Sequence, residues 1–122
     1  MSVGGNYVEW RLRVTNNDPE LFTVTKNGAR INLTGLLLRL VIEWPGGALV
    51  KTSSNPAEIE ILDQAEGADT EGQFNVALSF ADRALLPIDQ PARHELFQVA
   101  DGIEVTMFWG DLVATKWNER HA

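Results

Sequence analysis

The chain has 122 residues, of which 44% are hydrophobic and 22% charged, and its formal net charge is −7. This size and composition predict one globular domain over residues 1–122, with an ordered core over about 7–117. The acidic balance disfavours nucleic acid and anionic membrane surfaces as partners, because both would repel the chain. The absence of cysteine excludes disulfides, thiolate metal ligands and cysteine nucleophiles.

The first residues, MSVGGNYVEW, contain none of the three regions of a secretory signal peptide. We therefore expect cytoplasmic synthesis without export. The most apolar run, Leu36 to Trp44, has nine residues and includes Arg39 and Glu43. A transmembrane helix needs about 20 apolar residues, so this run does not predict a membrane anchor.

Apolar residues recur at every second position in several parts of the chain, which is the period of a β-strand. In chain order these segments are Val8–Val14, Leu36–Trp44, Ile59–Ile61, Phe74–Phe80 and Ile103–Trp109. Each of them is expected to turn its apolar positions toward a common core.

Residues typical of tight turns separate the strands, among them Asn27-Gly28, Pro45-Gly46-Gly47, Asp101-Gly102 and Gly110-Asp111. The glycines expected to have a structural role in turns are Gly28, Gly35, Gly47 and Gly102. Gly35 would bend the chain after Leu33-Thr34 and admit the long strand that follows, because glycine tolerates backbone angles closed to other residues.

One segment, Ala81 to Ile88, is able to form a helical turn, with Asp82 as its N-cap and Pro87 as its stop. Short strands spaced at roughly 8 to 12 residues are typical of sandwiches and barrels. We therefore predict an all-β fold, an antiparallel Ig-like β-sandwich of about seven to nine strands with one short helical turn.

Four carboxylates lie close together in the segment Asp63–Gly72, namely Asp63, Glu66, Asp69 and Glu71. Such oxygen ligands suit calcium, but their spacing does not match the EF-hand loop. A solvated loop between two strands is the main interpretation, and a weak ion site is the alternative.

The two histidines, His94 and His121, are not accompanied by a G-x-S-x-G nucleophile motif. His94 is expected at a strand edge or on the surface, and His121 is the penultimate residue. The glycine-rich phosphate motifs are also missing from the sequence. The sequence therefore predicts a protein that is not an enzyme, without catalytic residues and without a cofactor.

Four tryptophans are many for a chain of this length. Trp10, Trp44 and Trp109 fall on the apolar faces of predicted strands, which favours core packing. Trp117 is expected to be exposed and, with Tyr7, is a candidate for interaction with a partner. Because exposed aromatic rings also stack on sugars, a carbohydrate-binding module that uses Trp117 with Tyr7 or Trp109 is a second hypothesis.

Several motifs follow one another in an order found in a known family. They are a turn glycine at Gly28, the corner Leu33-Thr34-Gly35, the segment from Gly72 to Asp82, and the segment from Asp101-Gly102 to Ala114. From about Tyr7 to Trp117 the chain resembles the small Ig-like β-sandwich domain at the N-terminus of phage baseplate upper proteins (BppU-like) and related tail-fibre attachment proteins.

This resemblance implies a non-enzymatic structural or assembly protein of a phage or prophage particle, in the tail, the baseplate or a fibre attachment. It would act through protein–protein contacts with other virion proteins or with further copies of itself. A homo-oligomer, assembled into a virion after cytoplasmic synthesis, is therefore expected.

Overall fold

The structure, a computed structural model, describes residues 6–88 and 90–115. Eleven strands and one helix follow one another in this part of the chain. Their bounds are β1 (Asn6–Tyr7), β2 (Trp10–Arg13), β3 (Glu20–Thr23), β4 (Thr25–Lys26), β5 (Ala29–Arg30), β6 (Leu37–Trp44), β7 (Gly47–Thr52), β8 (Ile59–Ile61), β9 (Gln73–Val76), α1 (Phe80–Ala84), β10 (Pro91–Ala100) and β11 (Ile103–Thr115). Since β1, β4 and β5 have two residues each, eight strands are longer. The predicted β-sandwich with one short helix is confirmed.

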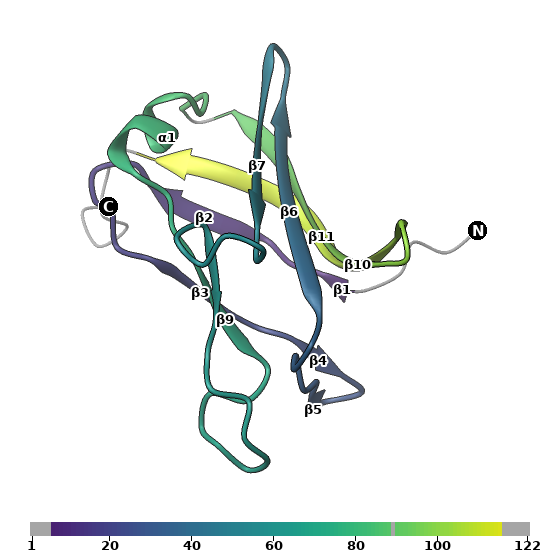
Figure 1. Ribbon diagram of the computed structural model, residues 1–122. Coiled ribbons are helices and arrows are strands. Elements are labelled where there is room, and N and C mark those ends of the chain that lie inside the picture. The colour runs from purple at the N-terminus through teal and green to yellow at the C-terminus, as the bar shows by residue number, and fades with distance from the viewer. Residues whose placement is uncertain (1–5, 89, 116–122) are drawn as a thin grey trace.

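Six strands form the larger sheet, in the order β1-β11-β10-β6-β7, with β2 also paired to β11 (Figure 1). The pairs among β6, β7, β10 and β11 are antiparallel. In contrast to the antiparallel prediction, β1 and β2 lie parallel to β11. This edge of the sheet therefore joins the beginning of the described chain to its last strand.

The second layer of the sandwich is the three-stranded sheet β3-β9-β8, and β4 and β5 form a separate hairpin (Figure 1). The core includes Leu38, Leu40 and Ile42 of β6, Leu96 of β10, Leu112 of β11, and Phe74 and Val76 of β9. Within it, the ring of Phe22 stacks on those of Phe74 and Phe108, with 5.4 Å between centroids in each pair. Aromatic stacking thus links the two layers at their centre.

The predicted strand Leu36–Trp44 is confirmed as β6, which lies between β10 and β7. It follows a tight turn in which the Leu36 N–H donates to the Leu33 carbonyl at 3.1 Å. Gly35 occupies this turn with φ of 75°, and Leu33 is fully buried. The corner therefore anchors the chain in the core just before β6 begins.

The other turn glycines have different roles. Gly28 and Gly102 have φ of 80° and 77°, the left-handed conformation that favours glycine. In the β6–β7 hairpin Gly46 has φ of 100°, whereas Gly47 is paired with Trp44. A Cβ at Gly47 would lie 2.6 Å from the Trp44 ring. Gly47 is thus needed for the close approach of this ring.

The helical turn begins and ends earlier than Ala81–Ile88. Helix α1 covers Phe80–Ala84, and its N-cap is Ser79, not Asp82. Asp82 occupies the third helical position, where its carboxylate accepts from the Ser79 N–H while the Ser79 hydroxyl accepts from the Asp82 N–H. This reciprocal capping box satisfies two backbone donors, which explains why Ser79 is the better start. Nowhere in residues 6–88 or 90–115 is there a helix long and apolar enough to cross a membrane.

The last strand differs from its prediction in two ways. Gly110-Asp111 is not a turn, since β11 runs unbroken from Ile103 to Thr115. The buried positions include Phe108 rather than Trp109, and Ile103 is 65% exposed. A register shift explains why Phe108 is buried in place of Trp109, because Leu96 pairs with Phe108 but Phe97 pairs with Thr106. The extra residue on β11 forms a β-bulge that exchanges the two faces of the strand.

Gly110 lies where β11 meets the junction of β1 and β2. A Cβ at Gly110 would be 2.0 Å from the carbonyl oxygen of Val8. The same oxygen lies 2.6 Å from Nε2 of His94, which pairs with Gly110 across the sheet. The missing side chain therefore makes room for a backbone carbonyl that His94 binds.

A fully buried arginine holds the loop between β2 and β3 against α1. The Arg83 guanidinium donates to the carbonyls of Leu78, Arg13 and Asp18 at 2.8, 2.7 and 2.6 Å. It lies 3.7 Å from the Glu20 carboxylate. Burial lowers the pKa of Arg83, and the neighbouring carboxylates oppose this shift. The side chain thus joins two segments that are distant in the sequence, the one around α1 and the one from Arg13 to Asp18.

Candidate interaction surface

The larger sheet has one face against the core and one outer face. On β6, Leu38, Leu40 and Ile42 face the core, so the alternating positions Arg39, Val41 and Glu43 face outward. Pairing extends this outer face to Arg93, Glu95 and Phe97 on β10 and to Trp109 on β11. We refer to these residues, with Tyr7 on β1, as the outer face of the larger sheet.

Two aromatic rings and a cation form a continuous group on this outer face. The rings of Tyr7 and Trp109 meet edge to face, with centroids 5.1 Å apart and an angle of 81° between planes. The Arg93 guanidinium lies 5.5 Å from the centre of the Trp109 ring, a cation–π distance. The Tyr7 hydroxyl donates to Asp111 at 2.9 Å, and this hydrogen bond raises the pKa of Tyr7.

A second cation–aromatic pair lies further along the same strands. The Arg39 guanidinium is 5.5 Å from the centre of the Phe97 ring and forms an ion pair with Glu104. Next to it, the Thr106 hydroxyl donates to the Glu95 carboxylate. The outer face thus combines arginines with aromatic rings, two residue classes that are enriched in protein–protein interfaces.

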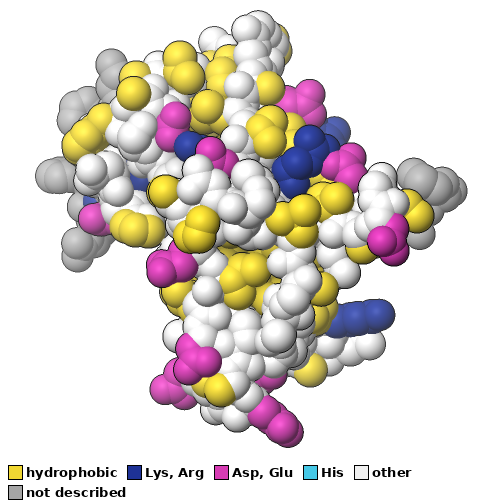
Figure 2. Space-filling view, in the orientation of Figure 1, with side chains coloured by type: hydrophobic (Ala, Val, Ile, Leu, Met, Phe, Trp, Pro, Cys, Tyr) yellow, Lys and Arg dark blue, Asp and Glu magenta, His cyan; other side chains and the backbone are white. Residues whose placement is uncertain are grey.

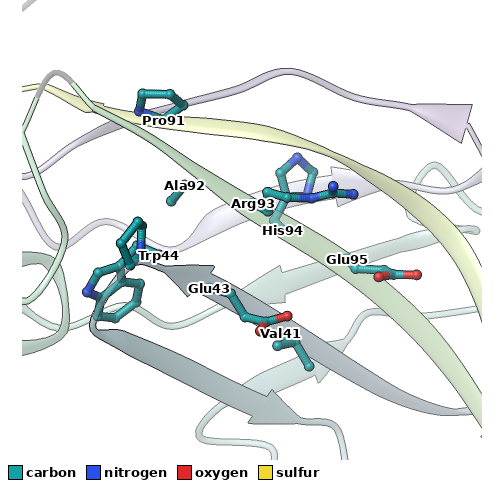
Figure 3. Close-up of a pocket in the computed structure, with 9 residues that line it drawn as sticks. Val41, Glu43, Trp44, Pro91, Ala92, Arg93, His94 and Glu95 are labelled. Carbon is teal, nitrogen blue, oxygen red and sulfur yellow. The ribbon is translucent and has the colours of Figure 1, made fainter.

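A hollow of about 420 Å³ opens at the end of this face (Figure 3). It is lined by Val41, Glu43, Trp44 and Pro45 of the β6 end and turn, and by the segment Pro91–Glu95 of β10. Its size lies within the range of about 300–1,000 Å³ that is typical of binding sites. We refer to it as the β6–β10 hollow.

The acidic segment Asp63–Gly72 is an exposed loop between β8 and β9. Figure 2 shows its acidic side chains at the lower end of the molecule. Asp63, Glu66 and Asp69 are exposed. Glu71 accepts from the Asn32 side chain at 2.9 Å. Across the described ranges, three or more metal-ligating side chains nowhere gather as an ion site would need. The alternative of a weak ion site therefore has no geometric support.

Gln64, which the sequence reading did not single out, organises this loop. Its Oε1 accepts from the N–H groups of Leu33 and Gly72 at 2.8 and 2.9 Å. Its Nε2 donates to the carbonyls of Leu62 and Thr70 at 3.0 and 3.1 Å. A single glutamine in a polar loop gives no sequence signal of such a role, because its partners are backbone groups.

His94 is buried in the centre of the larger sheet, which corrects its expected place at an edge or on the surface. Its ring meets those of Trp10 and Phe108 edge to face, at 5.4 and 5.7 Å. Its Nδ1 is buried and makes no hydrogen bond within the described residues. Burial lowers the pKa of His94, which keeps the ring neutral. With its only bonded nitrogen on a backbone carbonyl, His94 is a structural residue.

The tryptophans differ in exposure. Trp10 is buried, and its indole N–H donates to Glu20 at 3.0 Å. Trp44 and Trp109 are half-buried and belong to the hollow and the outer face, so the expectation of core packing holds fully for Trp10 alone. Trp117 and His121 lie outside the described residues. Because the Tyr7 and Trp109 rings are close to perpendicular, they do not form a flat platform for a sugar ring.

Neither the hollow nor the cation–aromatic pairs were predicted from the sequence. Each depends on the register between β6, β10 and β11, which brings Arg93 to Trp109, 16 positions further along the chain, and Arg39 to Phe97, 58 positions further along. The available signal was the alternation in Arg93–Phe97, where Arg93 and Glu95 are separated by His94 and followed by Leu96. It indicates an exposed strand face but does not identify the neighbouring strand.

A comparison with solved structures finds the "N-terminal domain of phage TP901-1 ORF48", with a TM-score of 0.52 and 16% sequence identity. The match covers 90% of this chain and 85% of that chain. At this identity the likeness shows a shared fold, and for the fold it confirms the resemblance to the baseplate upper protein domain. No protein-family model and no curated protein matches the sequence.

Proposed function

We propose that the chain is a non-enzymatic structural or assembly protein of a phage or prophage particle, in the tail, the baseplate or a fibre attachment. The observation that carries this proposal is the sandwich fold shared with a phage protein domain over 90% of the chain. Its partners are other virion proteins or further copies of itself. The motifs from Gly28 to Ala114 support the same assignment.

The outer face of the larger sheet is the surface best suited to these contacts. It carries Trp109, Phe97 and the 51% exposed Tyr7, and aromatic residues together with arginine are enriched at the centres of interfaces. The sheet edge at β7 is less suited to pairing with another strand. Lys51 points inward there and binds Asp82 of α1 at 2.8 Å, and an inward charge on an edge strand disfavours strand addition.

The carbohydrate-binding hypothesis is not favoured by any observation on the described aromatic residues. A sugar platform needs rings that present a common plane, and the Tyr7 and Trp109 planes meet at 81°. The protein–protein proposal requires no such plane, because edge-to-face rings still offer a large apolar contact area.

The proposal is tested on particles produced by cells that express the chain. We expect mass spectrometry of gradient-purified particles to find the chain at a fixed ratio to the tail proteins. A double variant, Tyr7→Ala with Trp109→Ala, should be incorporated less, whereas Glu60→Gln on the exposed side of β8 should be incorporated normally. A chain that is expressed but absent from the particles contradicts the proposal.

A further inference from the structure

The tip of the β4–β5 hairpin is the dipeptide Asn27-Gly28, whose residues both have left-handed backbone angles, with φ of 54° and 80°. Lys26 pairs with Ala29 across this two-residue turn. Asn-Gly suits such a turn, because both central residues need a positive φ. Both residues are exposed, and a Cβ at Gly28 would meet no described residue within 4 Å apart from its chain neighbours. The peptide bond between Asn27 and Gly28 is therefore open to solvent.

An asparagine that precedes glycine is able to modify itself in water. The backbone nitrogen of the glycine attacks the side-chain carbon Cγ of the asparagine, and a C–N bond forms. The side-chain nitrogen leaves as ammonia and takes the proton of the attacking N–H. Water then opens the resulting succinimide ring at one of its two carbonyls, which gives aspartate or isoaspartate. The reaction needs a backbone N–H without a hydrogen-bond partner, and it is easiest at glycine, because glycine has no Cβ to shield its nitrogen.

The structure meets these needs at Asn27 and at no other asparagine of residues 6–88 and 90–115. Each of the others precedes a residue that has a Cβ, and they are Asn6, Asn16, Asn17, Asn32, Asn55 and Asn75. The N–H after Asn17 donates to the Asn16 side chain at 3.2 Å, and the N–H after Asn32 donates to Gln64 at 2.8 Å. Within the described ranges, neither the Gly28 N–H nor the Asn27 side chain has a hydrogen-bond partner.

The hairpin that carries Asn27 is also easy to open. Closing the succinimide ring changes the backbone of the turn, so the reaction needs the pairing around it to open. Strands β4 and β5 have two exposed residues each and form a two-stranded sheet of their own. Such a hairpin is at most marginally stable by itself. The turn Asp101-Gly102 has similar φ values of 52° and 77°, but it joins strands of ten and thirteen residues.

A change at Asn27 would reach beyond the turn. Deamidation replaces a neutral amide by a carboxylate, so the net charge of the chain goes from −7 to −8. Isoaspartate also adds one methylene group to the main chain, which disturbs the pairing of Lys26 with Ala29 and of Thr25 with Arg30. The Arg30 side chain donates to the carbonyls of Asp69 and Glu71. The pairing of the hairpin therefore positions a contact with the acidic segment Asp63–Gly72.

We propose that Asn27 is a site of spontaneous deamidation, and that the isoaspartate formed there loosens the β4–β5 hairpin and the contact of Arg30 with the acidic segment. The hairpin and this segment lie at the same end of the molecule (Figure 1). With age, the chain thus acquires a second form that is more acidic and less ordered at this end. The inference goes beyond the proposed function and does not depend on it.

The test compares the full chain with the variant Asp101→Asn, which places the same dipeptide in the β10–β11 turn. Both proteins are incubated at mildly alkaline pH and digested, and the peptides are analysed by mass spectrometry, with isoaspartate detected by an isoaspartyl methyltransferase. We expect residue 27 to lose its amide in both proteins while the other described asparagines keep theirs. Residue 101 of the variant should react at least about tenfold more slowly than residue 27, because opening the longer hairpin costs more free energy.

Two-dimensional NMR of the aged wild-type chain tests the structural consequence. We expect shifted amide signals at Arg30, Asp69 and Glu71 and unchanged signals in β6. The matched control is Asn27→Gly, which preserves a turn sequence of the same type and has no side chain to react, so its spectrum should not change with time.

Four results would overturn the inference. Residue 27 could keep its amide in the folded chain while it reacts in the chain unfolded in urea, or another described asparagine could react first. Equal rates at residues 27 and 101 would show that hairpin opening does not select the site. Unchanged signals at Arg30, Asp69 and Glu71 after residue 27 has reacted would show that the hairpin does not control the acidic segment.

Discussion

Arg83 and His94 are the two buried polar side chains of the described structure, and they bind backbone carbonyls rather than substrates. Arg83 donates to three backbone carbonyls, and its bond to the Leu78 carbonyl is fully buried. His94 satisfies one, at the crossing of β1–β2 and β11. In both cases a titratable side chain holds together segments that no regular hydrogen-bond ladder connects.

We predict that Arg83→Met lowers the free energy of unfolding by about 3 kcal/mol. The substitution keeps most of the buried volume but leaves the carbonyls of Leu78, Arg13 and Asp18 without donors, and unsatisfied buried groups are costly. Urea unfolding followed by tryptophan fluorescence measures the change. Arg93→Met is the control, since the exposed cation–π contact with Trp109 is worth at most about 1 kcal/mol. Equal effects of the two substitutions would contradict the assigned role of Arg83.

We also predict that stability decreases as the pH falls below about 6.5, the usual pKa of histidine. Burial lowers the pKa of His94 in the folded state, so between the lowered pKa and about 6.5 the unfolded chain binds the proton more readily. The free energy of unfolding therefore rises with pH in this window, and the full contribution of neutral His94 is reached above it. Asp82, whose pKa is also lowered, acts at more acidic pH, through and below its ordinary value of 3.8.

Urea unfolding at pH 7.5 and at about pH 5.5 tests this dependence. His94→Phe removes the titrating group. The free energy of unfolding of this variant should therefore be the same at both pH values, even if it is lower than that of the wild type. A wild-type curve that is flat over this window, or a slope that remains in the variant, would show that His94 is not responsible.

At the scale of elements, the approach of β1–β2 to β11 depends on one position without a side chain. Val8 and Gly110 are in contact through backbone atoms alone. The Val8 N–H donates to the Trp109 carbonyl at 2.8 Å, which fixes the two strands at this distance. Any side chain at Gly110 has to separate β11 from the strands that pair with it in parallel.

Gly110→Ala is expected to lower the free energy of unfolding by about 3 kcal/mol, because a methyl group 2.0 Å from the Val8 oxygen cannot be accommodated without moving the strand. Thermal unfolding followed by circular dichroism measures the loss. Gly67→Ala is a suitable control: Gly67 has φ of 79° and open space around it, so only backbone strain of about 1–2 kcal/mol is expected. If Gly67→Ala were the more damaging substitution, the close-approach argument would fail.

The sequence predicted the elements whose pattern is local, and it missed those that depend on pairing. The alternation in Leu36–Trp44 identified β6, because a central strand facing one core needs only a period of two. The same reasoning assigned the wrong face to Trp109, since a bulge after Thr106 reverses the alternation and has no signature of its own. Gly110 was read as a turn because glycine in a turn and glycine under a crossing strand look the same in a sequence.

The candidate site was less predictable than the fold. Tyr7 was identified as an interaction residue, but its partner Trp109 was assigned to the core and Arg93 was not considered. Their meeting depends on β1 lying parallel to β11 and on β10 pairing with β11, neither of which a sequence pattern specifies. The hollow likewise needs the β6–β7 turn and the start of β10 to lie side by side.

At the scale of the whole molecule, stability is expected to be uneven. The long strands β6, β10 and β11 pair along most of their length and bury Leu40, Leu96 and Leu112 completely. The β4–β5 hairpin has two residues in each strand, all of them exposed. Local opening is easiest where few apolar groups are buried.

Hydrogen exchange monitored by NMR should therefore show the slowest amides in β6 and β10 and fast exchange at Thr25–Lys26 and Ala29–Arg30. The amides of β6 and β10 exchange only when the sheet opens as a unit, whereas the hairpin can open by itself. The Leu33 amide is a useful internal comparison: it is bound by Gln64 Oε1 at 2.8 Å, and Gln64→Ala should accelerate its exchange without changing that of β6. Equal protection in the hairpin and in β6 would contradict this uneven distribution.

The parallel pairing of β1 and β2 with β11 has a consequence for the order of folding. Tyr7 pairs with Trp109 and Trp10 pairs with Leu112, so these strands cannot take their places until nearly the whole described chain has left the ribosome. Closing so large a loop costs conformational entropy before the stabilising contacts form. Sandwiches rich in pairings between distant residues therefore fold over about milliseconds to seconds. The β6–β7 hairpin is local and can form early, whereas the β10–β11 hairpin can form only when the last described strand has been synthesised. The residues that are synthesised first therefore take their places in the sheet last, once β11 is available to pair with them.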